Sequence, residues 1–73
     1  MMNESEIEKF RILLRHWIEH NQEHGEEFKA WAEKAKSLGK AVVQEDMLEA
    51  ARLMDKSSET LNNALKKLND GKL

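Results

Sequence analysis

All three histidines of the chain lie in one short stretch, from His16 to Glu27. They stand four residues apart, at His16, His20 and His24, and carboxylates surround them. Residues four apart lie on one side of an α-helix, so the imidazoles would form a shallow stripe edged by acidic groups. Imidazole with carboxylate is a common ligand set for nickel, zinc, cobalt and copper. The stretch therefore predicts a transition-metal site.

Two three-ligand sets fit this spacing. The first set, His20, His24 and Glu27, shares one face of the helix. The second set, one turn earlier, is His16, His20 and Glu23. The repeat of apolar residues places His20 and His24 closest to a packed face and His16 further out, which favours the first set. A facing helix could add a carboxylate. The full group of candidate ligands is His16, His20, Glu23, His24, Glu27, Asp55 and Glu59.

Patterns typical of catalysis are missing from the sequence. Di-iron bundles use Glu-x-x-His pairs, and zinc proteases use His-Glu-x-x-His; the chain contains neither. Ser57 and Ser58 lack the glycines of a nucleophile elbow, and three scattered glycines cannot form a phosphate loop. The chain has no cysteine, which excludes thiolate ligands and disulfides. We therefore expect a protein that is not an enzyme.

The charge and hydropathy of the chain argue against two classes of partner, nucleic acids and membranes. Twelve Lys and Arg residues are interspersed with fourteen Asp and Glu residues, for a net charge of -2. This argues against nucleic-acid binding, which needs a concentrated basic face. No apolar run approaches the roughly 20 residues of a membrane span, and the acidic N-terminus lacks a signal-peptide core. We expect a cytoplasmic protein with no membrane contact.

The elements that must position these residues are two long helices. The chain has no proline, and 36% of its residues are charged, which with periodic apolar residues indicates helix. The first helix is predicted from about 5 to 37, unbroken at Gly25 because the apolar repeat keeps its phase there. Its predicted packing positions alternate in steps of three and four: Ile7, Phe10, Leu14, Trp17, Asn21, His24, Phe28, Trp31, Ala35 and Leu38.

A turn is predicted at 38–40, where Gly39 can close the first helix, and a second helix from about 41 to 69. Its predicted packing positions are Val43, Met47, Ala50, Met54, Ser57, Leu61, Ala64 and Leu68, with Leu48, Ala51 and Leu65 flanking. A short turn makes the helices antiparallel, so residues 1–73 form one all-α hairpin domain. Residues whose numbers sum to roughly 79 should lie level.

That register aligns the polar interruptions of the two helices. Asn21 and His24 fall level with Asp55 and the segment 57–59. The pattern predicts a polar layer across the middle of the hairpin. The layer fits two functions: a site for a metal ion such as nickel or zinc, or a structural layer that fixes register and partner number.

Two helices alone make a thin structure with little core. Each predicted packing face is wide enough to touch a further helix, so we expect self-association into a four-helix bundle, most simply as a two-fold homodimer. A higher homo-oligomer or a protein partner would also cover these faces.

The segment from Leu14 to Trp31, LRHWIEHNQEHGEEFKAW, resembles a small, uncharacterised prokaryotic helical family with an HWIEHN-x-EH core. Members of that family look like companions of small nickel-binding accessory proteins of the carbon monoxide dehydrogenase type. The resemblance implies a nickel-related role for His16, His20 and His24. The leading hypothesis is a small metal-binding accessory or storage module. The alternative is a helical oligomerisation or protein-interaction module with a structural polar layer.

Overall fold

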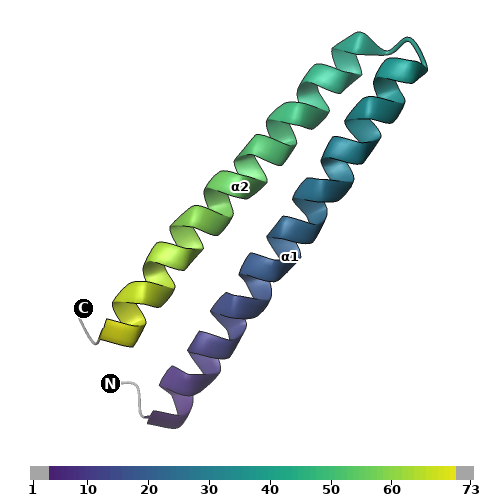
Figure 1. Ribbon diagram of the computed structural model, residues 1–73. Helices are drawn as coiled ribbons and strands as arrows, with labels where there is room; N and C mark the ends of the chain where they lie inside the picture. The colour runs from purple at the N-terminus through teal and green to yellow at the C-terminus, as the bar shows by residue number, and fades with distance from the viewer. Residues whose placement is uncertain (1–3, 71–73) are drawn as a thin grey trace.

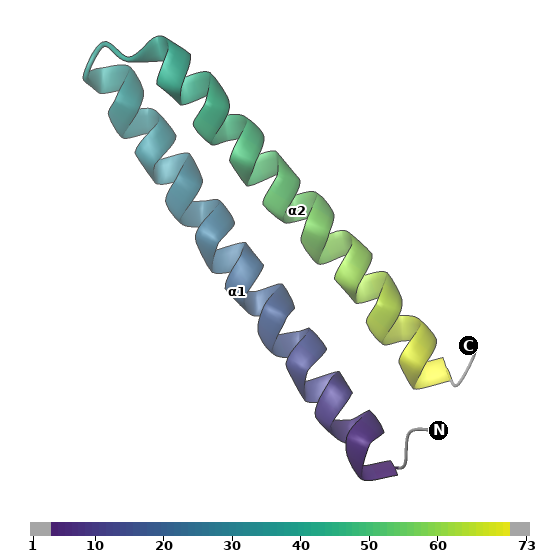
Figure 2. The same ribbon diagram turned by 180° about the vertical axis from the view of Figure 1, so that it is seen from behind.

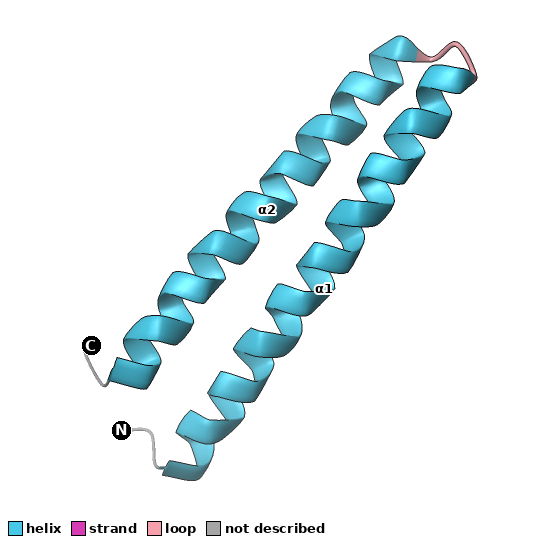
Figure 3. Ribbon diagram, in the orientation of Figure 1, coloured by secondary structure: helices cyan, strands magenta, loops and turns pink. Residues whose placement is uncertain are grey.

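The computed structural model describes residues 4–70 of the chain. Helix α1 spans Glu4–Ser37 and helix α2 spans Ala41–Asp70. The two run antiparallel, side by side along their whole length, in both views (Figures 1 and 2). The first turn of α1 and the last turn of α2 lie at the same end, opposite the connecting loop (Figure 3). The all-α hairpin predicted from the sequence is confirmed, and the described residues contain no strand.

The turn between the helices closes α1 with two backbone hydrogen bonds. The Lys40 N–H donates to the Ala35 carbonyl over 2.8 Å, and the Gly39 N–H donates to the Lys36 carbonyl over 3.0 Å. Gly39 has a φ of 74°, a left-handed conformation that costs glycine little. These are the bonds of a Schellman motif, which gives partners to carbonyls that a helix end leaves unpaired. The chain therefore reverses within three residues.

Helix α1 continues through Gly25 without a break. Gly25 is buried against α2, and a Cβ built on it would lie 3.6 Å from the Met54 Cβ. The glycine therefore lies at the contact between the helices, where its small size lets the two backbones approach closely.

The face that α1 turns toward α2 differs from the predicted one. Every second position of the predicted pattern does face α2: Ile7, Leu14, Asn21, Phe28 and Ala35. The predicted packing positions between these residues are wrong. Arg11, Ile18, Gly25 and Ala32 complete the contact, whereas Phe10, Trp17 and Trp31 are 36%, 42% and 61% exposed.

The same shift of one position occurs in α2. Met47, Met54, Leu61 and Leu68 face α1 as predicted. Between them the contact uses Gln44, Ala51, Ser58 and Leu65 in place of Val43, Ala50, Ser57 and Ala64. The physical reason is size: the small residues Gly25, Ala32 and Ala51 permit close helix contact, and the bulky tryptophans do not.

The predicted register is confirmed. Three pairs of residues that face each other across the helices mark the register: Gly25 and Met54, Asn21 and Ser57, and Arg11 and Asn69. The residue numbers of these pairs sum to 79, 78 and 80, close to the expected 79.

The hairpin is long and thin. It measures 53 × 17 × 15 Å, with a radius of gyration of 16.4 Å where a compact chain of this length would have about 11 Å. Its buried apolar residues are Leu14, Ala32, Ala35 and Ala51, and within residues 4–70 none of the largest side chains is fully buried. Neither described helix combines the length and apolar content needed to cross a membrane. The isolated hairpin thus has a very small core.

Candidate functional site

The centre of the candidate site is the pair His20 and His24. Their Nε2 atoms lie 2.9 Å apart, and their rings meet edge to face at a centroid distance of 4.4 Å. They stand one helical turn apart on α1, which brings the side chains together. At 2.9 Å one nitrogen donates a proton to the lone pair of the other, so the pair shares one hydrogen bond when both rings are neutral.

Glu27 lies on the far side of His24. Its Oε1 is 3.4 Å from His24 Nδ1. A carboxylate at this position favours the tautomer of His24 that carries its proton on Nδ1, which leaves the Nε2 lone pair directed at His20. Carboxylates orient metal-binding imidazoles in this way in many metal sites. Glu27 is thus placed to orient His24.

His16 and Glu23 lie further out. The His16 ring stacks on His20 at a centroid distance of 5.8 Å, and the His16 side chain is exposed. Glu23 is exposed too and stands seven residues after His16, on the same line along the helix. His16 thus lies outside the close pair formed by His20 and His24.

Asp55 and Glu59 do not join the histidines. They line a groove of about 360 Å³ together with Ile18, Gln22, Ser58 and Asn62. Asp55 forms an ion pair with Lys29 at 3.9 Å, and Glu59 forms one with Lys56 at 3.7 Å. Ile18 and Gln22 flank the helix contact on the side opposite to His24, so these carboxylates face the other groove of the hairpin.

The predicted polar layer is present in part. The Asn21 side chain donates a hydrogen bond to Ser57 Oγ over 3.1 Å, between the two helices. Ser58 is buried, and its hydroxyl has no hydrogen-bond partner among the described residues. His24 does not enter this layer, because Gly25 takes the position between the helices.

Within the described residues of one hairpin, two imidazole nitrogens lie close together. Within residues 4–70, no three His, Asp or Glu side chains converge closely enough to hold a metal together. The separation of the two Nε2 atoms is nevertheless informative. Metal–nitrogen bonds of 2.0–2.1 Å at a right angle put the nitrogens about 2.9 Å apart, whereas a tetrahedral angle puts them about 3.4 Å apart. The two hydrogen-bonded nitrogens are thus close enough to act as neighbouring ligands of one ion once the proton between them is displaced.

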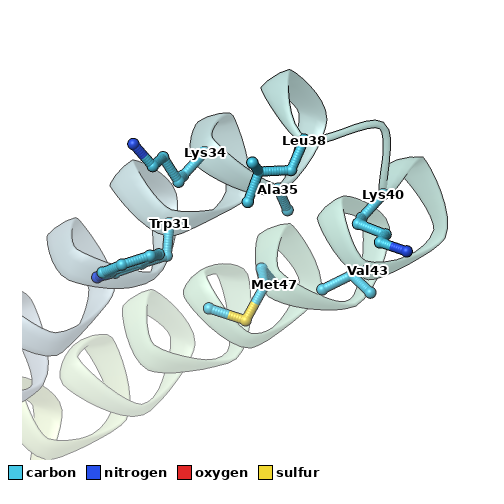
Figure 4. Close-up of a pocket in the computed structure, with 7 residues that line it drawn as sticks. All are labelled: Trp31, Lys34, Ala35, Leu38, Lys40, Val43 and Met47. Atoms are coloured by element: carbon cyan, nitrogen blue, oxygen red, sulfur yellow. The ribbon is translucent and has the colours of Figure 1, made fainter.

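His24 also belongs to a line of large side chains. Phe10, Trp17, His24, Trp31 and Leu38 stand seven residues apart and run along one side of α1; we call this line the heptad stripe. Near the turn, the stripe borders a shallow pocket of about 350 Å³. Figure 4 shows Trp31 and Leu38 of α1 and Val43 and Met47 of α2 lining this pocket. The hairpin thus has one largely apolar groove near the turn, beside Trp31 and Leu38, and one polar groove beside Asp55.

The sequence contains a signal for the true helix contact. Gly25, Ala32, Ala51 and Ser58 are small, and in each helix the pair stands seven residues apart. Small residues in heptad spacing on both helices indicate close packing of the backbones. Weighing size as well as hydrophobicity would have separated the helix contact from the heptad stripe.

Comparison with known proteins places the chain in a family. A family model described as a domain of unknown function, DUF8180, matches residues 10–68. An uncharacterized protein of Archaeoglobus fulgidus is 37% identical over 59 residues, which cover 81% of this chain and 94% of that protein. No solved structure matches the chain. The region matched by the family model contains the three histidines and all five residues of the heptad stripe, and on these matches the chain belongs to the DUF8180 family.

Proposed function

We propose that the protein is a small cytoplasmic module that binds a divalent transition metal through His20 and His24, as an accessory or storage protein. The observation that carries the proposal is the 2.9 Å separation of the two Nε2 atoms. Neutral imidazole is a good ligand for nickel, copper, cobalt and zinc. The pair suits each of these metals, and the titration described below distinguishes them.

The surroundings of the pair support the same function. His24 is held between Glu27 at Nδ1 and the Phe28 ring, whose centroid is 6.0 Å from the imidazole centroid. The ring is therefore restrained on two sides while its Nε2 remains directed outward from the helix contact. A restrained ligand loses less conformational entropy on binding a metal. Both imidazoles are also accessible enough for an ion to reach them.

Calorimetric titration of tag-free protein with nickel, copper, cobalt and zinc tests this proposal. We expect at least one metal to bind with a Kd below about 10 µM, which corresponds to about 7 kcal/mol. The variant His20→Ala/His24→Ala should lose at least about tenfold in affinity, or about 1.4 kcal/mol.

The matched control is His16→Ala, which removes an imidazole from the same helix outside the pair. It should change the affinity by less than about threefold, or about 0.7 kcal/mol. Circular dichroism should give the same helix content for all three proteins. Binding weaker than about 10 µM for every metal, or equal binding by the double variant, would refute the function.

A second candidate function is a helical oligomerisation or protein-interaction module. The observation that favours it is the exposure of the heptad stripe, whose two tryptophans are large apolar side chains at the surface. Exposed apolar patches of this kind mark interaction surfaces in soluble proteins. In this function the Asn21–Ser57 hydrogen bond fixes register, and no metal is needed.

A further inference from the structure

The hairpin exposes more surface than a monomer of its mass should. Its accessible surface is 5778 Å², whereas a globular monomer of 8.5 kDa exposes about 4,700 Å². The excess of about 1,100 Å² is more than the roughly 800 Å² that each partner of a stable complex buries. The largest exposed apolar side chains, Phe10, Trp17 and Trp31, all lie on the heptad stripe.

The order of residues in the stripe is symmetric about His24. Trp17 and Trp31 stand seven residues before and after it, and Phe10 and Leu38 stand fourteen before and after. Each step of seven residues rises about 10.5 Å along the helix. A second copy of α1 laid antiparallel across the stripe, with its His24 opposite this one, would put Trp17 against the partner's Trp31. Phe10 would meet the partner's Leu38 in the same way.

We propose that two copies of this chain pair antiparallel through the heptad stripe, with a two-fold axis passing beside His24. The two tryptophan pairs lie on either side of the axis and exclude water from it. Aromatic side chains are the residues that contribute most to such interfaces. The axis passes close to the middle of the hairpin, since the level of His24 is also that of Asp55, midway along α2. The helices of the two copies therefore overlap over most of their length.

The residues beside the stripe also complement each other in this arrangement. His20 and Glu27 lie on the outer edge of the stripe, almost evenly spaced about the axis. The antiparallel pairing brings His20 of each copy level with Glu27 of the other. Leu13 and Lys34, each two turns further out, are related in the same way. A parallel pairing would instead put like residues opposite each other, Glu27 against Glu27, which is unfavourable.

Helix α2 leaves room for this partner. On the same side as the stripe, α2 carries four residues seven apart, of which all but the first are small: Val43, Ala50, Ser57 and Ala64. Small side chains on one helix beside large ones on the other give the interdigitating surface of a four-helix bundle. The tryptophans of the partner thus find space above α2.

The dimer completes the metal site of the proposed function, on which this step rests. One chain offers two imidazoles, and within its described residues no third ligand joins them. At the axis, His20 and His24 of each copy give four nitrogens, with two Glu27 carboxylates beside them. The expected stoichiometry is therefore one metal ion per two chains.

Sedimentation equilibrium in EDTA tests the dimer without metal. We expect the wild type to be a dimer at 50 µM, and Trp17→Glu/Trp31→Glu to dissociate at least about 100-fold more readily. Ile12→Glu is the matched control, because Ile12 is exposed and lies 200° around the helix from Phe10. It should leave the dimer intact. A wild-type monomer at 50 µM would overturn the inference and leave metal binding by one chain open to the calorimetric test.

Disulfide trapping tests the direction of pairing, and does so even if the double tryptophan variant unfolds. The chain has no natural cysteine, so single substitutions are specific. Mixing Leu13→Cys with Lys34→Cys should give the mixed disulfide, whereas Leu13→Cys alone should not cross-link. Efficient cross-linking of Leu13→Cys to itself would indicate a parallel dimer and refute the pairing. Metal titration should saturate at 0.5 ion per chain, and saturation at 1.0 would refute the shared site.

Discussion

Asn21 of α1 and Ser57 of α2 are joined by a hydrogen bond of 3.1 Å across the hairpin. It is the hydrogen bond between the helices near mid-height, with Gly25 packed one turn away on α1. The bond forms only when the helices are in register, since a shift of one residue turns each side chain by about 100°. It therefore helps to hold the heptad stripe and the histidine pair at a fixed height relative to α2.

Replacing Asn21 by leucine should raise stability. Asn21 is half-buried, so leucine gains apolar burial, and the exposed Ser57 hydroxyl can bond to water. We expect the free energy of unfolding to rise by about 1 kcal/mol, measured by urea denaturation followed by circular dichroism. The variant should also form mixed oligomers, because the polar link no longer selects one register. Ser57→Ala, which removes only the bond, is the control and should lower stability slightly; a loss of stability in Asn21→Leu would contradict the prediction.

Gly25→Ala should also stabilise the hairpin. The added Cβ would lie 3.6 Å from Met54 Cβ, 3.7 Å from Asp55 Oδ1 and 4.0 Å from the Ala51 carbonyl oxygen, all ordinary contacts. Alanine is favoured over glycine inside a helix by about 1 kcal/mol. The melting temperature should rise accordingly. A fall would show that the helices at this level cannot tolerate even one methyl group.

Gly39→Ala should have the opposite effect. Its φ of 74° disfavours any residue with a Cβ, although no atom would obstruct the methyl group. We expect a loss of about 1 kcal/mol in thermal or urea unfolding. Gly39→Asn tests the cause, because asparagine tolerates the left-handed conformation better than alanine and should recover part of the loss. Equal stability of the alanine and wild-type proteins would mean that the turn can adopt another conformation.

Ser58→Ala should stabilise the protein because a buried hydroxyl is lost. Ser58 is 8% exposed, and its Oγ finds no hydrogen-bond partner within residues 4–70. An unpaired buried polar group costs about 1–3 kcal/mol, and alanine is also the better helix former. We expect a gain of about 1 kcal/mol in urea unfolding. If Ser58→Ala destabilises the hairpin, the hydroxyl must form a hydrogen bond in solution.

The helices and their register were predictable from the sequence because they depend on local rules. Gly39 closes α1 where a helix end was expected, and the observed helix bounds differ from the expected ones by no more than one residue. A short turn leaves two helices only the antiparallel arrangement. The register then follows from the position of the turn, which is why Asn21 was correctly placed level with Ser57.

The choice of contact face was not predictable from hydrophobicity alone. Both faces of α1 share Leu14 and Phe28, and the face with Trp17 and Trp31 is the more apolar of the two. The hairpin instead buries Gly25, because the benefit of close packing depends on what the second helix presents. For the same reason Asp55 and Glu59 were grouped with His24, although they lie at the opposite groove. Their predicted height along the hairpin was correct, but the side of α2 on which they lie was not.

The contrast between the two grooves determines what an assembly would display. In a dimer joined through the heptad stripe, the grooves lined by Gln22, Asp55 and Asn62 point away from each other on opposite outer faces. The two-fold axis would relate the groove of one copy to the same groove of the other, so the dimer would carry two. A partner with two binding modules, joined by a linker long enough to reach both grooves, would gain avidity without any new contact.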